Sequence, residues 1–192
     1  DADGDPLTYT IVIPPAHGTL APQPGTPANF VYTPAADYSG PDAFVFRAKD
    51  GSVDSAPATF SLTVTPVNDA PVAIPQALTT DEDVALPIIL AGTDVDSSAL
   101  TYAIVTPPAN GTLTPQGGDP RVYTYTPALD YSGSDSFTFR LNDGALDSAP
   151  ATVAITVRPI NDAPVAVAPA DVSVSEDTSV DIILAGSDVD ST

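Results

Sequence analysis

The segment Phe137-Thr138-Phe139-Arg140-Leu141 decides the fold, because apolar side chains alternate in it with polar ones. Alternation with a period of two gives a β-strand one buried face and one exposed face. Nearly the same segment, Phe44-Val45-Phe46-Arg47, occurs 93 residues upstream. A fixed period of this length indicates a tandem array of one structural unit that is long enough to be a domain with its own core.

Other segments recur at the same spacing. Asp37-Tyr38-Ser39-Gly40 returns as Asp130-Tyr131-Ser132-Gly133, and Asn68-Asp69-Ala70-Pro71 returns as Asn161-Asp162-Ala163-Pro164. The phase of the repeat predicts three parts: a repeat that lacks its first strands at 1–67, a complete repeat at 68–160, and the first strands of a third repeat at 161–192. Two explanations of the incomplete ends stay open. Either neighbouring sequence completes both ends, or the tail of one chain completes the head of the next in a fibre.

The complete repeat contains about seven strand-like segments separated by turn signals such as Asn110-Gly111 and Asp143-Gly144. The 22 Pro residues of the chain suit strand ends and interrupt any helical pattern. We therefore predict an all-β chain of tandem Greek-key sandwiches of the Ig-like or cadherin-like kind. The expected strands cover 72–78, 84–90, 100–104, 111–113, 122–126, 137–141 and 152–157.

Composition excludes several classes of function. The formal net charge is −20, and 23 of the 25 acidic residues are Asp. A nucleic-acid partner is excluded because no basic stripe is present to contact phosphates, and an anionic membrane surface is disfavoured for the same reason. No apolar run approaches 18 residues, so we expect no membrane insertion. Disorder is also disfavoured, since 43% of the residues are apolar and alternate as in strands.

Acidic and amide side chains gather where the repeats are expected to meet. Asn68 and Asp69 follow the last strand of one repeat, and Asp94 and Asp96 can direct two carboxylates from one loop toward one ion. Ca²⁺ takes six to eight oxygen ligands of this kind. Each motif alone has a commoner explanation: an Asx turn for Asp94 to Ser97, a hairpin turn for Asp143, and a linker for Asn68-Asp69. Their joint recurrence favours at least one Ca²⁺ per joint.

The order of these motifs resembles a cadherin repeat, and more closely the bacterial cadherin-like tandem modules of large surface proteins. The resemblance implies a Glu in the first strand, an Asp-x-Asp loop, an Asp-Arg-Glu-like loop, an Ala-x-Asp-Gly loop and an Asn-Asp linker. Glu176, Asp1, Asp3 and Asp50 occupy such positions as well. The metal ligands that it implies are Asp37, Asn68, Asp69, Ala70, Glu82, Asp94, Asp96, Asp130, Asp143, Asn161, Asp162, Ala163, Asp188 and Asp190, the two alanines through their carbonyl oxygens.

The chain also departs from the family pattern. Ser39 and Ser132 replace the Glu of the Asp-Arg-Glu loop, and Pro66 and Pro159 replace the leading Asp of the linker. The sequence therefore lacks part of the ligand set of the three-ion cluster in animal cadherins. Two further acidic residues recur near the lost Glu and are candidates to substitute for it, namely Asp42 and Asp135.

The sequence favours a structural function over catalysis. His17 is the only His, and there is no Cys, so nucleophilic catalysis lacks its usual groups. We expect calcium-binding, rigid extender repeats of a secreted or cell-surface bacterial adhesin, whose partners are neighbouring repeats. One alternative is a self-assembling extracellular filament, sheath or matrix with head-to-tail or lateral contacts between chains. A second alternative is a carbohydrate-binding accessory module of a secreted hydrolase, with tyrosines such as Tyr102 and Tyr123 forming a stacking face.

Overall fold

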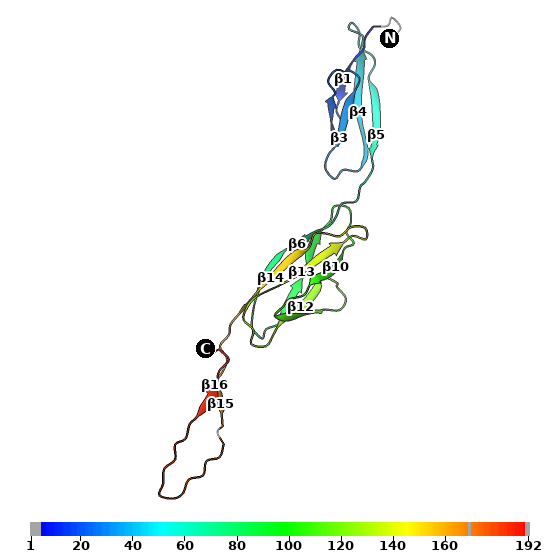
Figure 1. Ribbon diagram of the computed structural model, residues 1–192. Helices are drawn as coiled ribbons and strands as arrows, with labels where there is room; N and C mark the ends of the chain where they lie inside the picture. The colour runs from blue at the N-terminus through cyan, green and yellow to red at the C-terminus, as the bar shows by residue number, and fades with distance from the viewer. Residues whose placement is uncertain (1–4, 169, 191–192) are drawn as a thin grey trace. The chain divides into compact units, whose positions relative to one another are not determined.

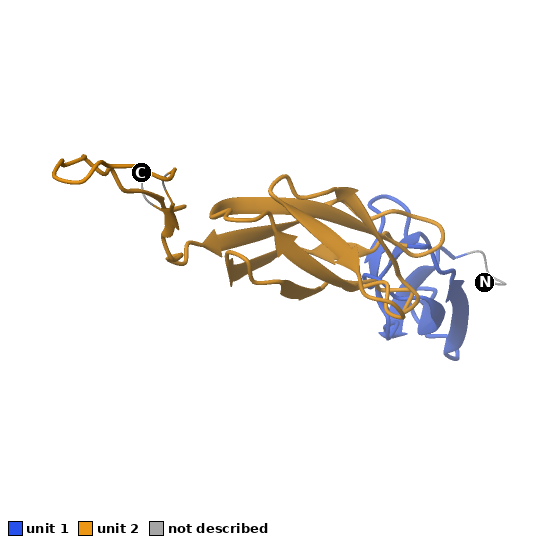
Figure 2. Cartoon of the chain, turned by 90° about the horizontal axis from the view of Figure 1, so that it is seen from below, with its two compact units in different colours: residues 1–68 blue, residues 69–192 orange. Residues whose placement is uncertain are grey.

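The computed structural model describes residues 5–168 and 170–190, and this part of the chain consists of β-strands and connecting loops without helices (Figure 1). The all-β class predicted from the sequence is confirmed. The chain divides into two compact units, Asp1–Asn68 and Asp69–Thr192 (Figure 2). Within the described residues, no helix is long and apolar enough to cross a membrane.

Unit 1 contains two small antiparallel sheets. The first has the strand order β1-β4-β5, and the second pairs β2 with β3. Strand β4 pairs along its C-terminal half with β1 and along its N-terminal half with β5, with Phe44 opposite Phe60. The bounds are β1 (Thr8–Ile13), β2 (Gly18–Pro22), β3 (Phe30–Pro34), β4 (Gly40–Lys49) and β5 (Ala58–Val64).

Residues 72–158 of unit 2 form a sandwich. One sheet has the order β10-β13-β14-β7, and the facing strands are β11-β12-β8 together with the pair β6-β9. The bounds are β6 (Val72–Ile74), β7 (Gln76–Asp81), β8 (Leu86–Ile89), β9 (Ala91–Thr93), β10 (Thr101–Thr106), β11 (Gly111–Pro115), β12 (Val122–Pro127), β13 (Gly133–Asn142) and β14 (Ala151–Arg158).

Two of the seven expected strands are interrupted in this sandwich. The strand expected at 72–78 breaks at Pro75, where a residue without an amide hydrogen cannot continue a ladder. Before the break β6 pairs antiparallel with β9, and after it β7 pairs parallel with β14, so the chain changes sheets. The strand expected at 84–90 begins instead at Leu86 and resumes after Leu90 as β9, which extends it to Thr93.

The core of unit 2 follows the alternation that the sequence shows. Every second residue of β14 is buried, and Phe137 and Phe139 of β13 are at most 1% exposed. Tyr125 of β12 is fully buried between the sheets, and Ile88 and Leu90 close the core from the other side. This arrangement places the loops at the two ends of the sandwich, where the acidic residues lie.

A buried carboxylate holds one of these ends together. Asp135 is 7% exposed, and it accepts hydrogen bonds from the amides of Ala109 and Asn110 and from the Tyr125 hydroxyl at 2.8 Å. Burial opposes ionisation of Asp135, but these hydrogen bonds together lower its pKa below the usual value.

Asp42 makes the equivalent contacts in unit 1, with Ala16, His17 and Tyr32 as donors. Both Asp42 and Asp135 therefore serve as anchors for a turn, which argues against the metal-binding role that their recurrence suggested. The same residues show how a single spacing in the sequence produces the same local structure twice.

The final part of the described chain carries a short hairpin, in which β15 (Val165–Val167) pairs with β16 (Ala185–Ser187) (Figure 1). Its register matches that of β6 and β9, because Val165 lies opposite Ser187 as Val72 lies opposite Thr93. The described residues between the two strands, 168 and 170–184, form no strand.

Candidate metal site

The parallel pairing of β7 with β14 creates the centre of the candidate site. Arg158, the last residue of β14, lies opposite Asp81, the last residue of β7. The amide of Glu82 donates to the carbonyl of Arg158 at 2.9 Å. The Glu82 carboxylate then accepts a hydrogen bond from the amide of Ile160 at 2.6 Å. The residues after β14 are thus fixed beside Glu82, which is 5% exposed.

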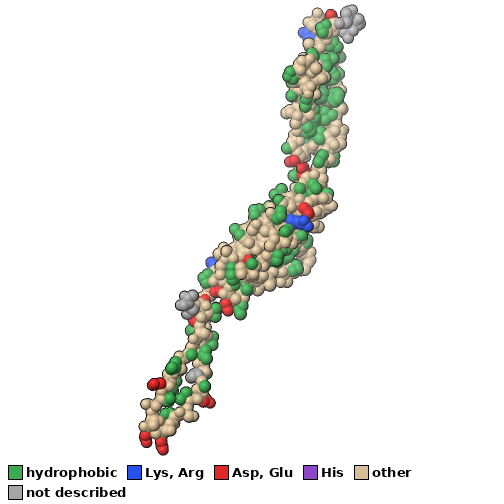
Figure 3. All heavy atoms as spheres, in the orientation of Figure 1, with side chains coloured by type: hydrophobic (Ala, Val, Ile, Leu, Met, Phe, Trp, Pro, Cys, Tyr) green, Lys and Arg blue, Asp and Glu red, His purple; other side chains and the backbone are tan. Residues whose placement is uncertain are grey.

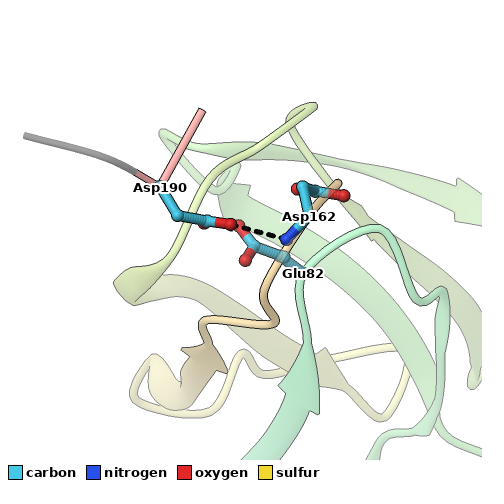
Figure 4. Close-up of side chains that lie close together, drawn as sticks. All are labelled: Glu82, Asp162 and Asp190. Atoms are coloured by element: carbon cyan, nitrogen blue, oxygen red, sulfur yellow. Dashed lines mark hydrogen bonds between the residues drawn. The ribbon is translucent and has the colours of Figure 1, made fainter. Parts of the chain in front are cut away.

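A first acidic group forms where this linker meets the loop after β16. Glu82, Asp162 and Asp190 each offer a carboxylate oxygen, and these oxygens all lie within 4.8 Å of one another (Figure 4). The amide of Asp162 donates to Asp190 Oδ2 at 2.5 Å, which is the dashed line in Figure 4. The amide of Asp190 in turn donates to Asp188 Oδ1 at 2.9 Å. One Glu from the sandwich and two Asp from the residues that follow it therefore converge.

A second acidic group shares Asp162 with the first. Asp83, Asp130 and Asp162 also offer oxygens within 4.8 Å of one another, and the amide of Asp130 donates to Asp83 Oδ1 at 3.4 Å. Burial, followed by the charges of Asp190, Asp83, Glu82 and Asp188, raises the pKa of Asp162. Ionised Asp162 is therefore disfavoured in a metal-free site, and a cation would reverse that penalty.

Asp83 is a member of this cluster that the sequence reasoning missed. Two signals were available: Asp83 directly follows Glu82, and the pair recurs as Glu176-Asp177. The structure adds that four Asp residues, Asp37, Asp83, Asp130 and Asp177, have φ between 56° and 67°. Asp tolerates this left-handed conformation better than most residues.

The donor set fits a hard divalent cation. The two groups supply five carboxylates, from Glu82, Asp83, Asp130, Asp162 and Asp190, and no nitrogen or sulfur ligand. Oxygen-only sets are the ones that Ca²⁺ prefers. Arg158 is the nearby cation at the end of β14, and it is engaged with Asp81, its Nε lying 2.7 Å from Asp81 Oδ1.

The loop that contains Asp94 and Asp96, at the other end of the sandwich, makes the same amide-to-carboxylate contacts as the loop after β16. The amide of Asp69 donates to Asp96 Oδ2 at 2.8 Å, and the amide of Asp96 donates to Asp94 Oδ1 at 2.8 Å. These contacts match those of Asp162, Asp190 and Asp188. In the described part of the chain, Asp94 Oδ2 is buried and has no hydrogen-bond partner. An unpaired buried carboxylate oxygen is costly unless a cation or water satisfies it.

Asp143 caps a turn in the structure, and its part in a metal site stays a prediction. Its Oδ1 accepts hydrogen bonds from the amides of Ala145 and Leu146 at 2.6 and 2.7 Å, as in an Asx turn. Among the described residues, Asp94, Asp96 and Asp143 do not form a group whose ligand oxygens all lie within 4.8 Å. Asp50 caps the corresponding turn of unit 1 through Ser52 and Val53.

The remaining predicted ligands stay predictions. Asn161 donates its side-chain amide to the carbonyl of Asp162 at 2.8 Å. Ala70 and Ala163 precede Pro71 and Pro164, where the chain has no assigned strand. Asp37 and Asn68 belong to unit 1, and Asp1 and Asp3 lie outside the described residues.

Comparisons with known proteins agree with the fold. The chain is 34% identical over 111 residues to integrin beta-like protein A of Dictyostelium discoideum, an alignment that covers 50% of this chain and 6% of that protein. It is 27% identical over 184 residues to integrin beta-like protein E of the same organism, covering 85% of this chain and 9% of that protein. The chain thus spans less than a tenth of these relatives.

A solved structure of protocadherin gammaB7 domains EC3-6, described as a cis-dimer, superposes with a TM-score of 0.52 at 17% identity, over 97% of this chain and 52% of that one. This likeness confirms the cadherin-like fold. The sequence profile of the bacterial Ig domain matches residues 1–63 and 68–156. Since these residues make up most of the chain, it belongs to the bacterial Ig domain family.

Proposed function

We propose that this chain is a calcium-binding, non-catalytic extender of a secreted or cell-surface adhesion protein, and that its immediate partners are neighbouring repeats. The observation that carries the proposal is the convergence of Glu82, Asp162 and Asp190, with Asp162 shared by the second group at Asp83 and Asp130. These residues come from a sandwich, from the linker that follows it, and from the loop after the next hairpin. A cation bound there would connect the linker to the sandwich before it and to the loop after the next hairpin.

Electrostatics explains why an ion would act as a stiffener. Without a cation, the carboxylates repel one another at short range, and burial together with this repulsion raises the pKa of Asp162. Repulsion favours conformations in which Asp188 and Asp190 move away from Glu82. A divalent cation replaces repulsion with shared coordination and thereby restricts the linker. The buried Oδ2 of Asp94, which has no hydrogen-bond partner among the described residues, supports cation binding by the loop that contacts Asp69 as well.

The relatives support an extracellular address. The curated relatives are integrin beta-like proteins, whose name fits an adhesion protein, and the fold is shared with protocadherin domains. Because the chain covers so little of those relatives, the role of the whole protein is part of the proposal. A carbohydrate-stacking role receives less support, because Tyr102, Tyr123 and Tyr125 are in or against the core of unit 2.

Calorimetric titration of the full chain with Ca²⁺ tests the proposal. We expect binding in the range of about 10⁻⁴ to 10⁻³ M that is typical of extracellular calcium modules. Asp162→Asn should weaken this binding at least about tenfold, because it removes a ligand from both groups. Asp171→Asn is the matched control, since it removes the same charge from an exposed position of the same segment. Absence of saturable Ca²⁺ binding, or equal loss in both variants, would contradict the proposal.

A further inference from the structure

Unit 2 contains a polar pocket between strand β10 and the loop that connects β11 with β12. Its volume of about 450 Å³ falls within the range of about 300–1,000 Å³ that small-molecule sites occupy. Its lining includes Ser97, Ser98, Leu100, Tyr102, Asp119 and Arg121. The lining residues that the structure describes all lie between positions 92 and 121, inside the sandwich of residues 72–158.

An ion pair fixes the orientation of Arg121 in this pocket. Arg121 Nε donates to Asp119 Oδ1 at 3.0 Å, and Arg121 Nη2 donates to Asp119 Oδ2 at 2.7 Å. The hydrogen bonds from Arg121 lower the pKa of Asp119 to about 2, so the pair stays charged at neutral pH. Among the described residues, Arg121 Nη1 has no hydrogen-bond partner. Because the guanidinium is planar and rigid, its remaining N–H groups point in fixed directions and can donate to a ligand.

The repeat shows that this ion pair is not needed to form the loop. Asp119 and Arg121 stand at the repeat positions of Thr26 and Ala28 in unit 1. The loops of the two units nevertheless close with the same backbone hydrogen bond. The amide of Val122 donates to the carbonyl of Asp119 at 3.1 Å, and the equivalent amide of unit 1 donates to the carbonyl of Thr26 at 2.9 Å. Uncharged residues therefore support the same turn, and the common fold does not require the charged pair of unit 2.

The pair also contributes little to the stability of unit 2. The side chains of Arg121 and Asp119 are 50% and 37% exposed, and ion pairs at such positions stabilise a fold only weakly. Basic side chains are scarce in this chain, which has five of them against 25 acidic ones, and few are visible on the face drawn in Figure 3. The position of Arg121 at a pocket, which neither the turn nor the stability of the fold requires, therefore points to a ligand.

The charges that line the pocket indicate a neutral ligand. Asp94 and Asp119 outnumber the single cation Arg121, and the chain has a net charge of −20, so an anion would be repelled. A metal ion is disfavoured at Asp119, because both of its carboxylate oxygens already accept hydrogen bonds from Arg121. A neutral ligand with several hydroxyl groups can accept from Arg121 and exchange hydrogen bonds with the hydroxyls of Ser97 and Ser98.

Two further residues give the same pocket an apolar wall. Leu100 and Tyr102 pack against the core of unit 2 and also line the pocket. An apolar wall with a few polar groups is typical of small-molecule sites, and a sugar ring presents C–H groups as well as hydroxyls. We infer that this pocket binds one neutral sugar residue of a glycan, with Arg121 as a donor to its hydroxyl groups. The sugar would be held by hydrogen bonds inside a pocket, in contrast to stacking on an exposed face of tyrosines.

Nuclear magnetic resonance titration of the full chain tests the inference. The probes are the methyl glycosides of glucose, galactose, mannose and N-acetylglucosamine, added to isotope-labelled protein in chelator so that calcium takes no part. We expect at least one glycoside to shift the amide signals of Ser97, Ser98 and Arg121, with a dissociation constant on the order of 1 mM. A ligand with about a dozen non-hydrogen atoms reaches this affinity at the usual binding energy per atom. The amide signals of unit 1 should not move.

A loop exchange between the two units supplies a variant that should keep the fold. Asp119→Thr together with Arg121→Ala installs the residues that unit 1 carries at these positions, and we expect it to weaken sugar binding at least about tenfold. Arg140→Ala is the matched control, because it removes the same charge from an ion pair of similar exposure, Arg140 with Asp147, outside the pocket. Circular dichroism checks that both variants stay folded.

Three results would overturn the inference. The first is that no glycoside shifts the signals of the pocket, and the second is that the loop exchange and the Arg140→Ala control lose binding equally. The third is that inorganic sulfate shifts these signals more strongly than any glycoside, which would assign the pocket to anions. None of these results depends on calcium, so the inference can fail while the proposed function stands.

Discussion

At the scale of single residues, two aspartates that both recur at the 93-residue period, Asp135 and Asp162, have opposite electrostatic properties. Asp135 is buried among hydrogen-bond donors that stabilise its charge, whereas burial, followed by the charges of neighbouring carboxylates, opposes the charge of Asp162. The pKa of Asp135 is lowered and that of Asp162 is raised. Asp135 therefore anchors the fold, while Asp162 is suited to receive a cation.

The Tyr125 hydroxyl should contribute measurably to the stability of unit 2. Tyr125→Phe removes the 2.8 Å hydrogen bond to Asp135, and hydrogen bonds to charged groups contribute about 1.5–3 kcal/mol. Tyr131→Phe is the control, because the Tyr131 hydroxyl donates to a backbone carbonyl at an exposed site. Urea unfolding followed by circular dichroism would measure both. Equal decreases in the free energy of unfolding of the two variants would show that the buried Tyr125–Asp135 hydrogen bond contributes no more than the exposed one.

The same pair predicts a dependence on pH. Because the folded-state pKa of Asp135 is lowered, its contribution is present above the unfolded pKa of about 3.9 and is lost as the pH falls through the folded value. Asp135→Asn should therefore lower the free energy of unfolding at pH 7 and matter less under more acidic conditions. A loss that stays constant down to about pH 2 would contradict this assignment.

Asp162 should have effects of opposite sign with and without calcium. Its raised pKa means that the ionised form costs the metal-free folded state stability above the unfolded pKa, and that this cost disappears as the pH falls. In chelator, Asp162→Asn should therefore melt at the same temperature as the wild type or higher. In Ca²⁺ it should melt lower. Thermal melts in both buffers decide the matter, and a lower melting temperature in both would indicate a purely structural role.

At the scale of elements, the hairpin of β11 and β12 depends on Gly111. A Cβ at this position would collide with the ring of Tyr125 and lie 2.7 Å from the carbonyl oxygen of Thr126. Gly111→Ala should therefore destabilise unit 2 by about 1–3 kcal/mol through overpacking. Gly117→Ala is the control, because nothing lies within 4 Å of the added carbon. Similar unfolding midpoints for the two variants would contradict the packing argument.

The strands were predictable from sequence because their alternation is local. The burial of Val153, Ile155 and Val157 follows the two-residue period directly. The change of sheet at Pro75 was not predictable, since it depends on which strands β6 and β7 pair with. Pro75 predicts that the strand is interrupted, but it does not predict which strands pair with β6 and β7.

The candidate site was predictable only in part. Motif order indicated Glu82, Asp130, Asp162 and Asp190, and the structure brings these residues into two adjoining groups. The inclusion of Asp83 depends on the turn after β7, and the separation of Asp143 from the groups depends on the hairpin after β13. Both are consequences of backbone geometry that residue type alone does not encode.

At the scale of the whole molecule, a chain of net charge −20 resists compaction through self-repulsion. Calcium bound to the folded state would offset that repulsion by mass action. At roughly tenfold excess over the dissociation constant, each site would contribute on the order of 1 kcal/mol. The effect would be concentrated where the acidic residues converge, because the core of unit 2 forms without them.

Hydrogen exchange measured by mass spectrometry, with Ca²⁺ and with chelator, tests this central claim most directly. The amides of Ile160 and Asp162 donate to carboxylates of the site, and the amide of Asp190 donates to the neighbouring Asp188. The exchange rates of these amides should therefore report on ion binding. We predict that Ca²⁺ slows exchange in residues 159–163 and 186–190 and leaves β13 and β14 unchanged. Identical exchange in these two segments with and without Ca²⁺ would contradict the account.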